Sequence, residues 1–211
     1  MQRWESLGIA AYGIYQDRAL GRFTEDPVRL VHFLRAGVKD TCVDLGTGNG
    51  IIALYANALY GCRFTGIDTD EDQLALARAS AQRNAQPIEF LGADVKDAPA
   101  LLGKAKYSLV TCNPPYFSSG PVPENAHRAA GRYAASPEPF IAAAAALLKN
   151  GGRFCLCFPA DRLPELCVLL SAHALEPKRI ELLTHAGKAG RVLLEAKKNA
   201  RPGAVVTVTE V

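Results

Sequence analysis

Residues 41–61 read TCVDLGTGNGIIALYANALYG. The apolar run 41–45 predicts a short buried strand, and the apolar run 51–60 predicts a helix that Gly61 ends. Three glycines lie between the two runs, at positions 46, 48 and 50. Glycine lets a ligand approach the backbone closely, and the start of the following helix offers unpaired N–H donors. This stretch therefore predicts the first strand–turn–helix unit of an α/β fold, with a ligand site at its turn.

The spacing of these glycines excludes two common phosphate-binding loops. A dinucleotide-binding loop would place its third glycine at position 51, which is Ile51, and a Walker loop needs a Gly-Lys-Ser/Thr sequence that is absent. What remains is an acidic residue, Asp44, shortly before Gly46 and Gly48. This arrangement suits a ligand with an ammonium group better than one with a pyrophosphate.

Strands and helices are expected to alternate along most of the chain. Asp26-Pro27 predicts the start of a helix that Gly37 ends, and Ser136-Pro137 predicts the start of an alanine-rich helix reaching Lys149. Further helices are expected near 70–84, 97–102 and 164–172, and further strands near 64–67, 88–91, 107–112, 153–158, 179–184, 191–196 and 205–208. Such alternation predicts a mostly parallel sheet covered by helices on both faces, and the turn 186–190 predicts an antiparallel hairpin near the C-terminus.

Two more acidic residues follow predicted strands. Asp68 ends the second strand, where a carboxylate can hold ribose hydroxyls, and Asp94 ends the third, where it can reach the amine of an adenine. Taken singly, an Asp at such a position is more often a helix cap or a solvated loop residue than a ligand-binding residue. Together with Asp44 they place acids after three consecutive strands, which capping alone explains poorly.

The fourth strand, 107–112, ends at Asn113-Pro114-Pro115-Tyr116-Phe117. Two successive prolines cannot continue a sheet, so they form a stiff turn. The Asn113 side-chain oxygen and the Pro114 carbonyl could accept two hydrogen bonds from one –NH2 group, while Tyr116 stacks on a flat ring. The alternative is an ordinary Asn-Pro turn with a buried tyrosine.

Length and composition limit the number of domains, the partners and the cellular location that we expect for the protein. The chain has 211 residues, enough for one α/β domain, and a mild net charge of +3 that permits nucleic acid as a partner without arguing for it. No apolar stretch approaches the roughly 20 residues of a membrane span, and no signal peptide is evident, so we expect a cytoplasmic protein with no membrane partner. The six cysteines lie in apolar runs without metal-ligand spacing, so we expect no metal site.

From about residue 15 to 200 the sequence resembles the class I S-adenosylmethionine-dependent methyltransferases, within the group that methylates amino nitrogens. The resemblance rests on the Asp44 loop and on the Asn-Pro-Pro-Tyr turn. It implies a Rossmann-like fold with a seven-stranded sheet and S-adenosyl-L-methionine as the cofactor. It also assigns Asp44, Gly46 and Gly48 to the methionine end of the cofactor, Asp68 to the ribose and Asp94 to the adenine.

Flanking matches resemble the bacterial tRNA adenine-N6 methyltransferases that modify A37, beside the anticodon, in valine tRNA. They lie at 16–17, 22–24 and 175–180. In that family Arg22, Phe23 and Thr24 lie near the methionine end of the cofactor. The resemblance implies that Asn113 and Pro114 hold the target amino group while Tyr116 and Phe117 stack on the base. The expected partner of the protein is the anticodon loop of tRNA, and we expect the protein to be a monomer.

The outlying segments admit two interpretations each. Arg128 and Arg132 could contact phosphates near the target base or lie in a solvated loop. The basic side chains of 176–201 could face RNA or merely keep a hairpin soluble. Residues 1–25 form an aromatic and basic arm, which could dock on the remaining single domain, 26–211, or on a polyanion.

Several rival functions use the same motifs. The turn could act on a glutamine side-chain amide of a protein, giving an N5-glutamine methyltransferase, or on an adenine of rRNA or DNA. Alternatively, the chain could be a binding module that holds S-adenosylmethionine or RNA without turnover. The presence of Asp44, Asp68 and Asn113 speaks against a module without activity.

Overall fold

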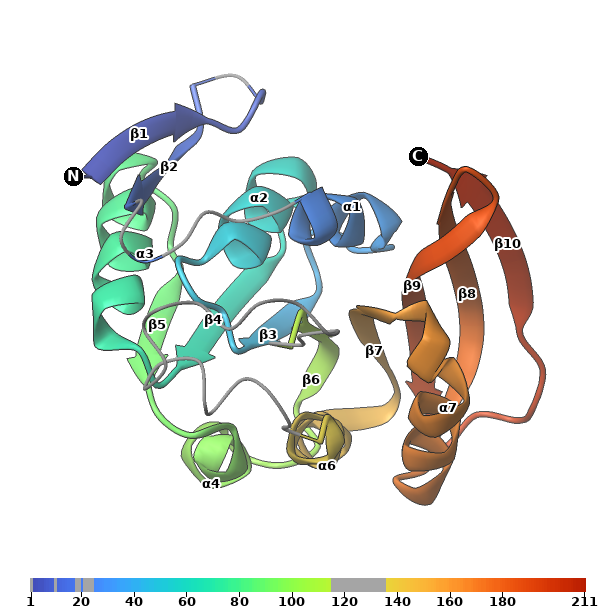
Figure 1. Cartoon of the computed structure of the whole chain (residues 1–211). Coiled ribbons are helices and arrows are strands. Elements are labelled where there is room, and N and C mark those ends of the chain that lie inside the picture. Colours follow the sequence, from blue (N-terminus) through green and yellow to red (C-terminus); the bar gives the residue numbers. More distant parts are fainter. Residues whose placement is uncertain (1, 10, 18–19, 21–24, 115–135) are drawn as a thin grey trace.

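The structure, a computed structural model, describes residues 2–9, 11–17, 20, 25–114 and 136–211. Its centre is an eight-stranded sheet with helices on both faces (Figure 1). In spatial order the strands are β10 (Val205–Glu210), β8 (Leu175–His185), β9 (Lys188–Lys198), β7 (Leu148–Pro159), β6 (Tyr107–Cys112), β3 (Thr41–Leu45), β4 (Arg63–Asp68) and β5 (Glu89–Gly92).

The strand directions agree with the mostly parallel sheet that the alternation predicts. Strands β7, β6, β3, β4 and β5 are parallel, and β9 runs antiparallel to both β7 and β8. The count of seven strands implied by the resemblance is one short, because β10 adds to the edge of β8 in parallel. All six residues of β10 are exposed, so main-chain hydrogen bonds rather than burial hold this strand.

The alternation of side chains along each strand divides the core into two layers. Cys42 and Leu109 face a cluster formed with α1 (Glu25–Phe33), α2 (Ile51–Tyr60) and α3 (Glu71–Arg83). Their neighbours Val43 and Val110 face the opposite cluster, with α4 (Ala98–Leu102), α6 (Glu138–Leu147) and α7 (Leu163–Ala172). Because these strands are covered on both sides, they are nearly continuous apolar runs.

Helix boundaries follow the predictions closely, with three corrections. Helix α1 ends at Phe33, before the predicted end at Gly37. Helix α1 begins at Glu25, so Asp26 is not its N-cap; its carboxylate instead accepts a hydrogen bond from Arg191 Nε at 3.0 Å. The alanine-rich helix α6 ends at Leu147, before the predicted Lys149, because Leu148 already pairs with Tyr107 as the start of β7. Two single-turn helices, η2 (Val95–Asp97) and η3 (Ala160–Arg162), precede α4 and α7.

The N-terminal residues form a separate antiparallel hairpin of β1 (Gln2–Ser6) and β2 (Gly13–Asp17). It packs against the end of α3 through Asn84, whose Oδ1 accepts from Gly13 N at 3.1 Å and whose Nδ2 donates to Gly13 O at 2.8 Å. Tyr15 N also donates to Ser80 Oγ at 2.9 Å. In the part of the chain that the structure describes, no helix has the length and apolar character that crossing a membrane requires.

Candidate functional site

The predicted site residues that the structure describes lie at or near the carboxyl ends of four neighbouring strands, in the order β6, β3, β4 and β5 (Figure 1). Leu45 of β3 pairs with both Cys112 of β6 and Ile67 of β4, so the three strands end at the same level. Asn113 therefore follows β6 beside the loop of residues 46–50, called the glycine loop, that follows β3. In α/β sheets this edge is where ligands bind.

The glycine loop has the backbone shape that its sequence predicts. Gly46 and Gly48 have φ values of 70° and 54°, in the left-handed region that favours glycine. Gly46 N and Thr47 N both donate to the carbonyl oxygen of Ile67, at 2.8 and 2.9 Å, which fixes the loop to β4. A Cβ atom added at Gly48 would meet no described atom within 4 Å. The space that the described residues leave there fits the close approach of a cofactor to the backbone.

Asp44 is fully buried in β3, and hydroxyl groups bind both of its oxygens. Thr47 Oγ1 donates to Oδ2 and Thr111 Oγ1 donates to Oδ1, each at 2.7 Å. Burial raises the pKa of this carboxyl, the two hydrogen bonds lower it, and the charge of Asp68 raises it again, which together give a pKa of about 7. A buried acid whose pKa lies this far above its ordinary value is typical of a functional site.

Asp68, the last residue of β4, joins the glycine loop to the start of α3. Its Oδ2 accepts from Gly48 N at 2.7 Å, and its Oδ1 accepts from Asp70 N at 3.0 Å. The neighbouring Asp70 is the true helix cap, since its Oδ1 accepts from the amides of the first turn of α3. Two carboxylate oxygens offer about four acceptor sites, so Asp68 retains capacity for hydroxyl groups of a ligand.

Asp94, after β5, and Asn113, after β6, lie on either side of Asp44 and Asp68. Asp94 is exposed two residues beyond β5, and its Oδ1 accepts from Lys96 N at 2.9 Å, which is the capping interaction named as an alternative. Asn113 is half-buried and Pro114 is buried. The other predicted site residues lie outside the described part of the chain: Arg22, Phe23, Thr24, Tyr116, Phe117, Arg128 and Arg132.

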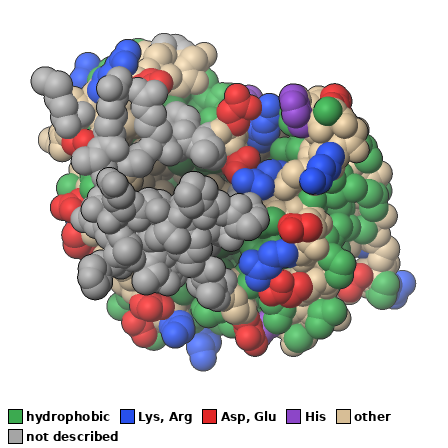
Figure 2. All heavy atoms as spheres, in the orientation of Figure 1, with side chains coloured by type: hydrophobic (Ala, Val, Ile, Leu, Met, Phe, Trp, Pro, Cys, Tyr) green, Lys and Arg blue, Asp and Glu red, His purple; other side chains and the backbone are tan. Residues whose placement is uncertain are grey.

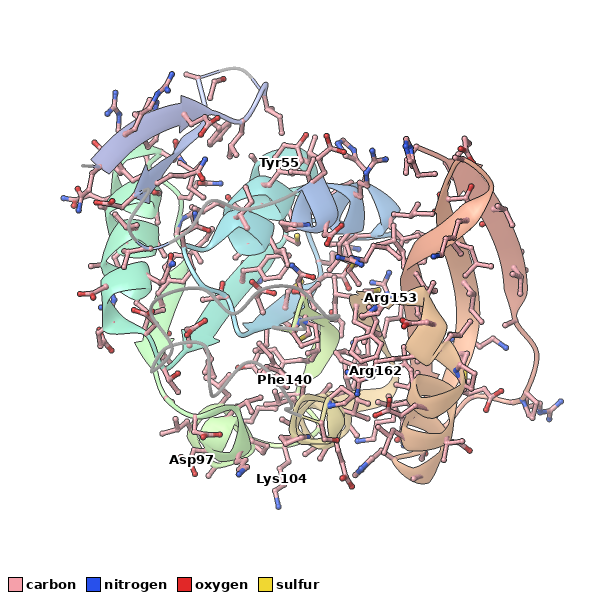
Figure 3. The ribbon with its side chains drawn as sticks, viewed as in Figure 1. Tyr55, Asp97, Lys104, Phe140, Arg153 and Arg162 are labelled. Carbon is pink, nitrogen blue, oxygen red and sulfur yellow. The ribbon has the colours of Figure 1, made fainter. Side chains whose placement is uncertain are left out.

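Sequence reasoning missed three residues of this site. Thr47 and Thr111 hold the Asp44 carboxyl, and the only signal for Thr111 was a hydroxyl between the apolar residues Val110 and Cys112. Phe140, from the first turn of α6 (Figure 3), lies against the loop, because a Cβ at Gly46 would be 3.2 Å from its ring. No pattern in the sequence indicates that contact.

Most of the basic side chains of 176–201 stabilise the fold. Arg179 and Arg191 form ion pairs with Glu195 and Asp26, and the amino groups of two lysines bind main-chain carbonyls. Those lysines are Lys178, bound to Arg201 O, and Lys198, bound to Ala145 O and Leu148 O. On the coloured part of the face in Figure 2, basic and acidic side chains are interspersed. In the described residues, no group of three or more His, Cys, Asp or Glu is placed to hold a metal ion.

Comparisons with known proteins give both a family and relatives. The model of a methyltransferase domain matches residues 42–152. A protein of Shewanella amazonensis named tRNA1(Val) (adenine(37)-N6)-methyltransferase is 33% identical over 177 residues, covering 81% of this chain and 75% of its own length. A release factor glutamine methyltransferase of Bordetella pertussis is 34% identical over 104 residues, covering 48% of this chain and 36% of its own length.

Solved structures share the fold. The T. thermophilus 16S rRNA N2 G1207 methyltransferase, solved with AdoMet and guanosine, superposes with a TM-score of 0.67 at 21% identity. The match covers 94% of this chain and 50% of that chain.

Proposed function

Because the chain belongs to the methyltransferase-domain family, we propose that it methylates the N6 amino nitrogen of an adenine in tRNA, with S-adenosylmethionine as the methyl donor. The observation that carries this proposal is the position of Asn113. It directly follows β6, whose last residue pairs with the last residue of β3, where the glycine loop begins. An amide that can hold an amino group thus lies beside a loop that fits the cofactor.

The residues present fit S-adenosylmethionine. Gly46 and Gly48 would let the methionine end approach the backbone, and Asp44 would supply the negative charge for its ammonium group. Asp68 would accept hydrogen bonds from the ribose hydroxyls, and Asp94 would accept one from the adenine amine. The sequence of 22–24 adds Arg22, Phe23 and Thr24 to the methionine end by family resemblance alone. When bound, the cofactor supplies an electrophilic methyl group.

Asn113 and Pro114 would orient the target amino group. Its two hydrogens would bond to the side-chain oxygen of Asn113 and to the Pro114 carbonyl, which turns the nitrogen lone pair toward the methyl group. The lone pair of an aromatic amine is delocalised into the ring, so positioning should supply most of the catalysis. Tyr116 and Phe117 would stack on the base. A methylated ammonium loses its proton readily, so no strong base is required.

We further propose that the substrate is A37 in the anticodon loop of valine tRNA, bound by a monomer in the cytoplasm. The Shewanella relative, named for modification of adenine 37 in tRNA1(Val), supports this choice. A loop base is already partly unstacked, so extruding it costs less than extruding a base from a stem. Arg128 and Arg132 would contact phosphates beside the base. Of the basic residues in the C-terminal hairpin, the exposed Lys188 and Lys197 remain candidates for contact with RNA.

The strongest rival is methylation of a protein glutamine side chain, since the shorter match to a release factor glutamine methyltransferase favours it. A glutamine amide presents an –NH2 group that Asn113 and Pro114 would hold in the same way. Methylation of an rRNA or DNA adenine, or binding without turnover, are further alternatives.

Labelled S-adenosylmethionine distinguishes these functions. The protein is incubated with tRNA from cells that lack the modification, and the tRNA is digested to nucleosides. We expect label in N6-methyladenosine with the wild type and none with Asn113→Ala, while Asn113→Ala still binds the cofactor in calorimetry. Label in protein instead of tRNA would favour the glutamine reaction. Cofactor binding without any labelled product would favour the binding module.

A further inference from the structure

Thr111 and Asp44 face each other across two neighbouring strands. They are directly paired in the parallel register of β6 and β3, and neither side chain has any exposed surface. The Thr111 hydroxyl donates to Asp44 Oδ1 at 2.7 Å. Strand β6 ends at Cys112, and Asn113 follows it, two residues after Thr111. One hydroxyl thus connects the acid before the glycine loop with the strand that carries the proposed catalytic amide.

The surroundings of Asp44 make this hydroxyl important. From β4, Asp68 adds a like charge. From β6, burial raises the pKa of the Cys112 thiol, and the nearby charges of Asp44 and Asp68 raise it further. The two groups that favour the ionised form are hydroxyls, one from Thr47 in the loop and one from Thr111. No cation from the described residues contributes to the shift in the Asp44 pKa. A bound ammonium group would therefore supply a positive charge that no described residue gives this carboxyl.

We propose that Thr111 is a positioning residue for the cofactor: its hydroxyl holds the Asp44 carboxylate in place beside the glycine loop, where the α-ammonium group of S-adenosylmethionine binds. The inference rests on the proposed function, because it concerns the same cofactor. It adds a residue outside both sequence motifs, at a position where a strand residue would otherwise be apolar.

A pH-dependent affinity follows. With a pKa of about 7, Asp44 is roughly half ionised in the free protein at neutral pH. Loss of the Thr111 hydroxyl removes a hydrogen bond that favours the carboxylate, so the pKa of Asp44 rises further. If it rises by about one unit, cofactor affinity near pH 7 falls about fivefold, and the deficit disappears as the pH rises above both pKa values.

The test is calorimetric binding of S-adenosylmethionine between pH 6 and pH 8.5. The variants are Thr111→Val, which removes the hydroxyl at nearly constant shape, and Thr111→Ser, which keeps it. Thr184→Val is the matched control, because Thr184 is another buried strand threonine whose hydroxyl donates to a carboxylate, that of Glu210, at the far edge of the sheet. Should valine prevent folding, Thr111→Cys keeps a small side chain with a weaker donor.

We expect Thr111→Val to bind S-adenosylmethionine more weakly than the wild type, by a factor that shrinks as the pH rises. Thr111→Ser should restore the affinity of the wild type. Thr184→Val should have the same pH profile as the wild type. An S-adenosyl analogue without the α-amino group should bind to the wild type and to Thr111→Val equally. Equal pH profiles for the wild type and Thr111→Val, or an equal loss of affinity for the analogue without the amino group, would overturn the inference alone. A wild type that binds no S-adenosylmethionine would overturn the proposed function and the inference together.

Discussion

The guanidinium of Arg179 covers the ring of Phe33 and binds the carbonyl of the same residue. Its carbon atom lies 4.0 Å from the ring centroid, and both of its terminal nitrogens donate to Phe33 O at 3.1 Å. Phe33 is the last residue of α1, and the last carbonyls of a helix have no partner within the helix. Arg179 also donates to Glu195 Oε2 at 3.2 Å. One side chain of β8 thus joins the end of α1 to the C-terminal hairpin.

Replacing Arg179 by methionine should destabilise the fold. The substitution keeps much of the apolar stem but leaves the Glu195 carboxylate, whose side chain is only 8% exposed, without its cation. Breaking a buried pair in this way costs about 3 kcal/mol of unfolding free energy. Urea denaturation measures the loss, and Arg162→Met, which breaks an exposed pair with Glu165, should cost less than about 1 kcal/mol. Equal losses for the two variants would refute the assigned role of Arg179.

Alanine substitutions should separate the contribution of the glycine loop to stability from its contribution to cofactor binding. At Gly48 an added Cβ meets no atom of the described residues, so Gly48→Ala costs about 1 kcal/mol of stability for its left-handed backbone but obstructs the cofactor. At Gly50 the same atom would lie 2.8 Å from the ring of Phe90, so steric strain adds about 1 to 3 kcal/mol. Thermal unfolding and cofactor calorimetry should therefore rank the two variants in opposite orders. If Gly48→Ala bound the cofactor as well as the wild type, the cofactor would have to lie elsewhere.

Local patterns were sufficient to predict much of this fold. Helix α2 spans Ile51–Tyr60 as expected, because Gly50 and Gly61 both take left-handed conformations that mark its ends. The order of strands and helices likewise predicted the parallel centre and the antiparallel hairpin. These features depend on residues close together in the sequence.

Contacts between distant residues were not predictable in the same way. One of the two hydroxyl partners of Asp44, Thr111, is 67 residues away, and only the register of β3 with β6 brings it opposite Asp44. Asp26 resembled a helix cap, but its observed partner Arg191 is 165 residues away. The pairing of β10 with β8 could not be inferred either, because an exposed β-like run does not specify its neighbour.

The N-terminal hairpin should open without unfolding of the domain. We propose residue 25 as the boundary between this arm and the domain, and Asn84 as the main anchor of the hairpin, through its two hydrogen bonds with Gly13. In Asn84→Ala the amides of β2 should exchange with solvent about thirtyfold faster, since two bonds are lost and each is worth about 1 kcal/mol. The amides of β6 should be unaffected. Asn150→Ala, which changes an exposed asparagine in the large sheet, serves as the control; an equal increase in β2 exchange there would exclude a specific anchor.

Titration of Asp44 should make the stability of the free protein depend on pH. Its pKa is raised from an ordinary value of 3.8 to about 7, chiefly by burial, so the folded state holds this proton over a range in which the unfolded state has released it. Where the folded state binds more protons, stability falls as the pH rises. The contribution of Asp44 is therefore fully present below pH 3.8, is lost as the pH rises toward 7, and is constant above that range.

The comparison that isolates this group is wild type against Asp44→Asn, whose amide does not titrate. Between pH 5 and pH 8 the unfolding free energy of the wild type should fall by about 2 to 3 kcal/mol relative to that of Asp44→Asn. Urea denaturation at several pH values measures the difference, and other titrating groups cancel because both proteins contain them. A difference that stayed constant with pH would mean that Asp44 is already ionised at pH 5. A saturating amount of S-adenosylmethionine should abolish most of the decline, because its ammonium group stabilises the carboxylate.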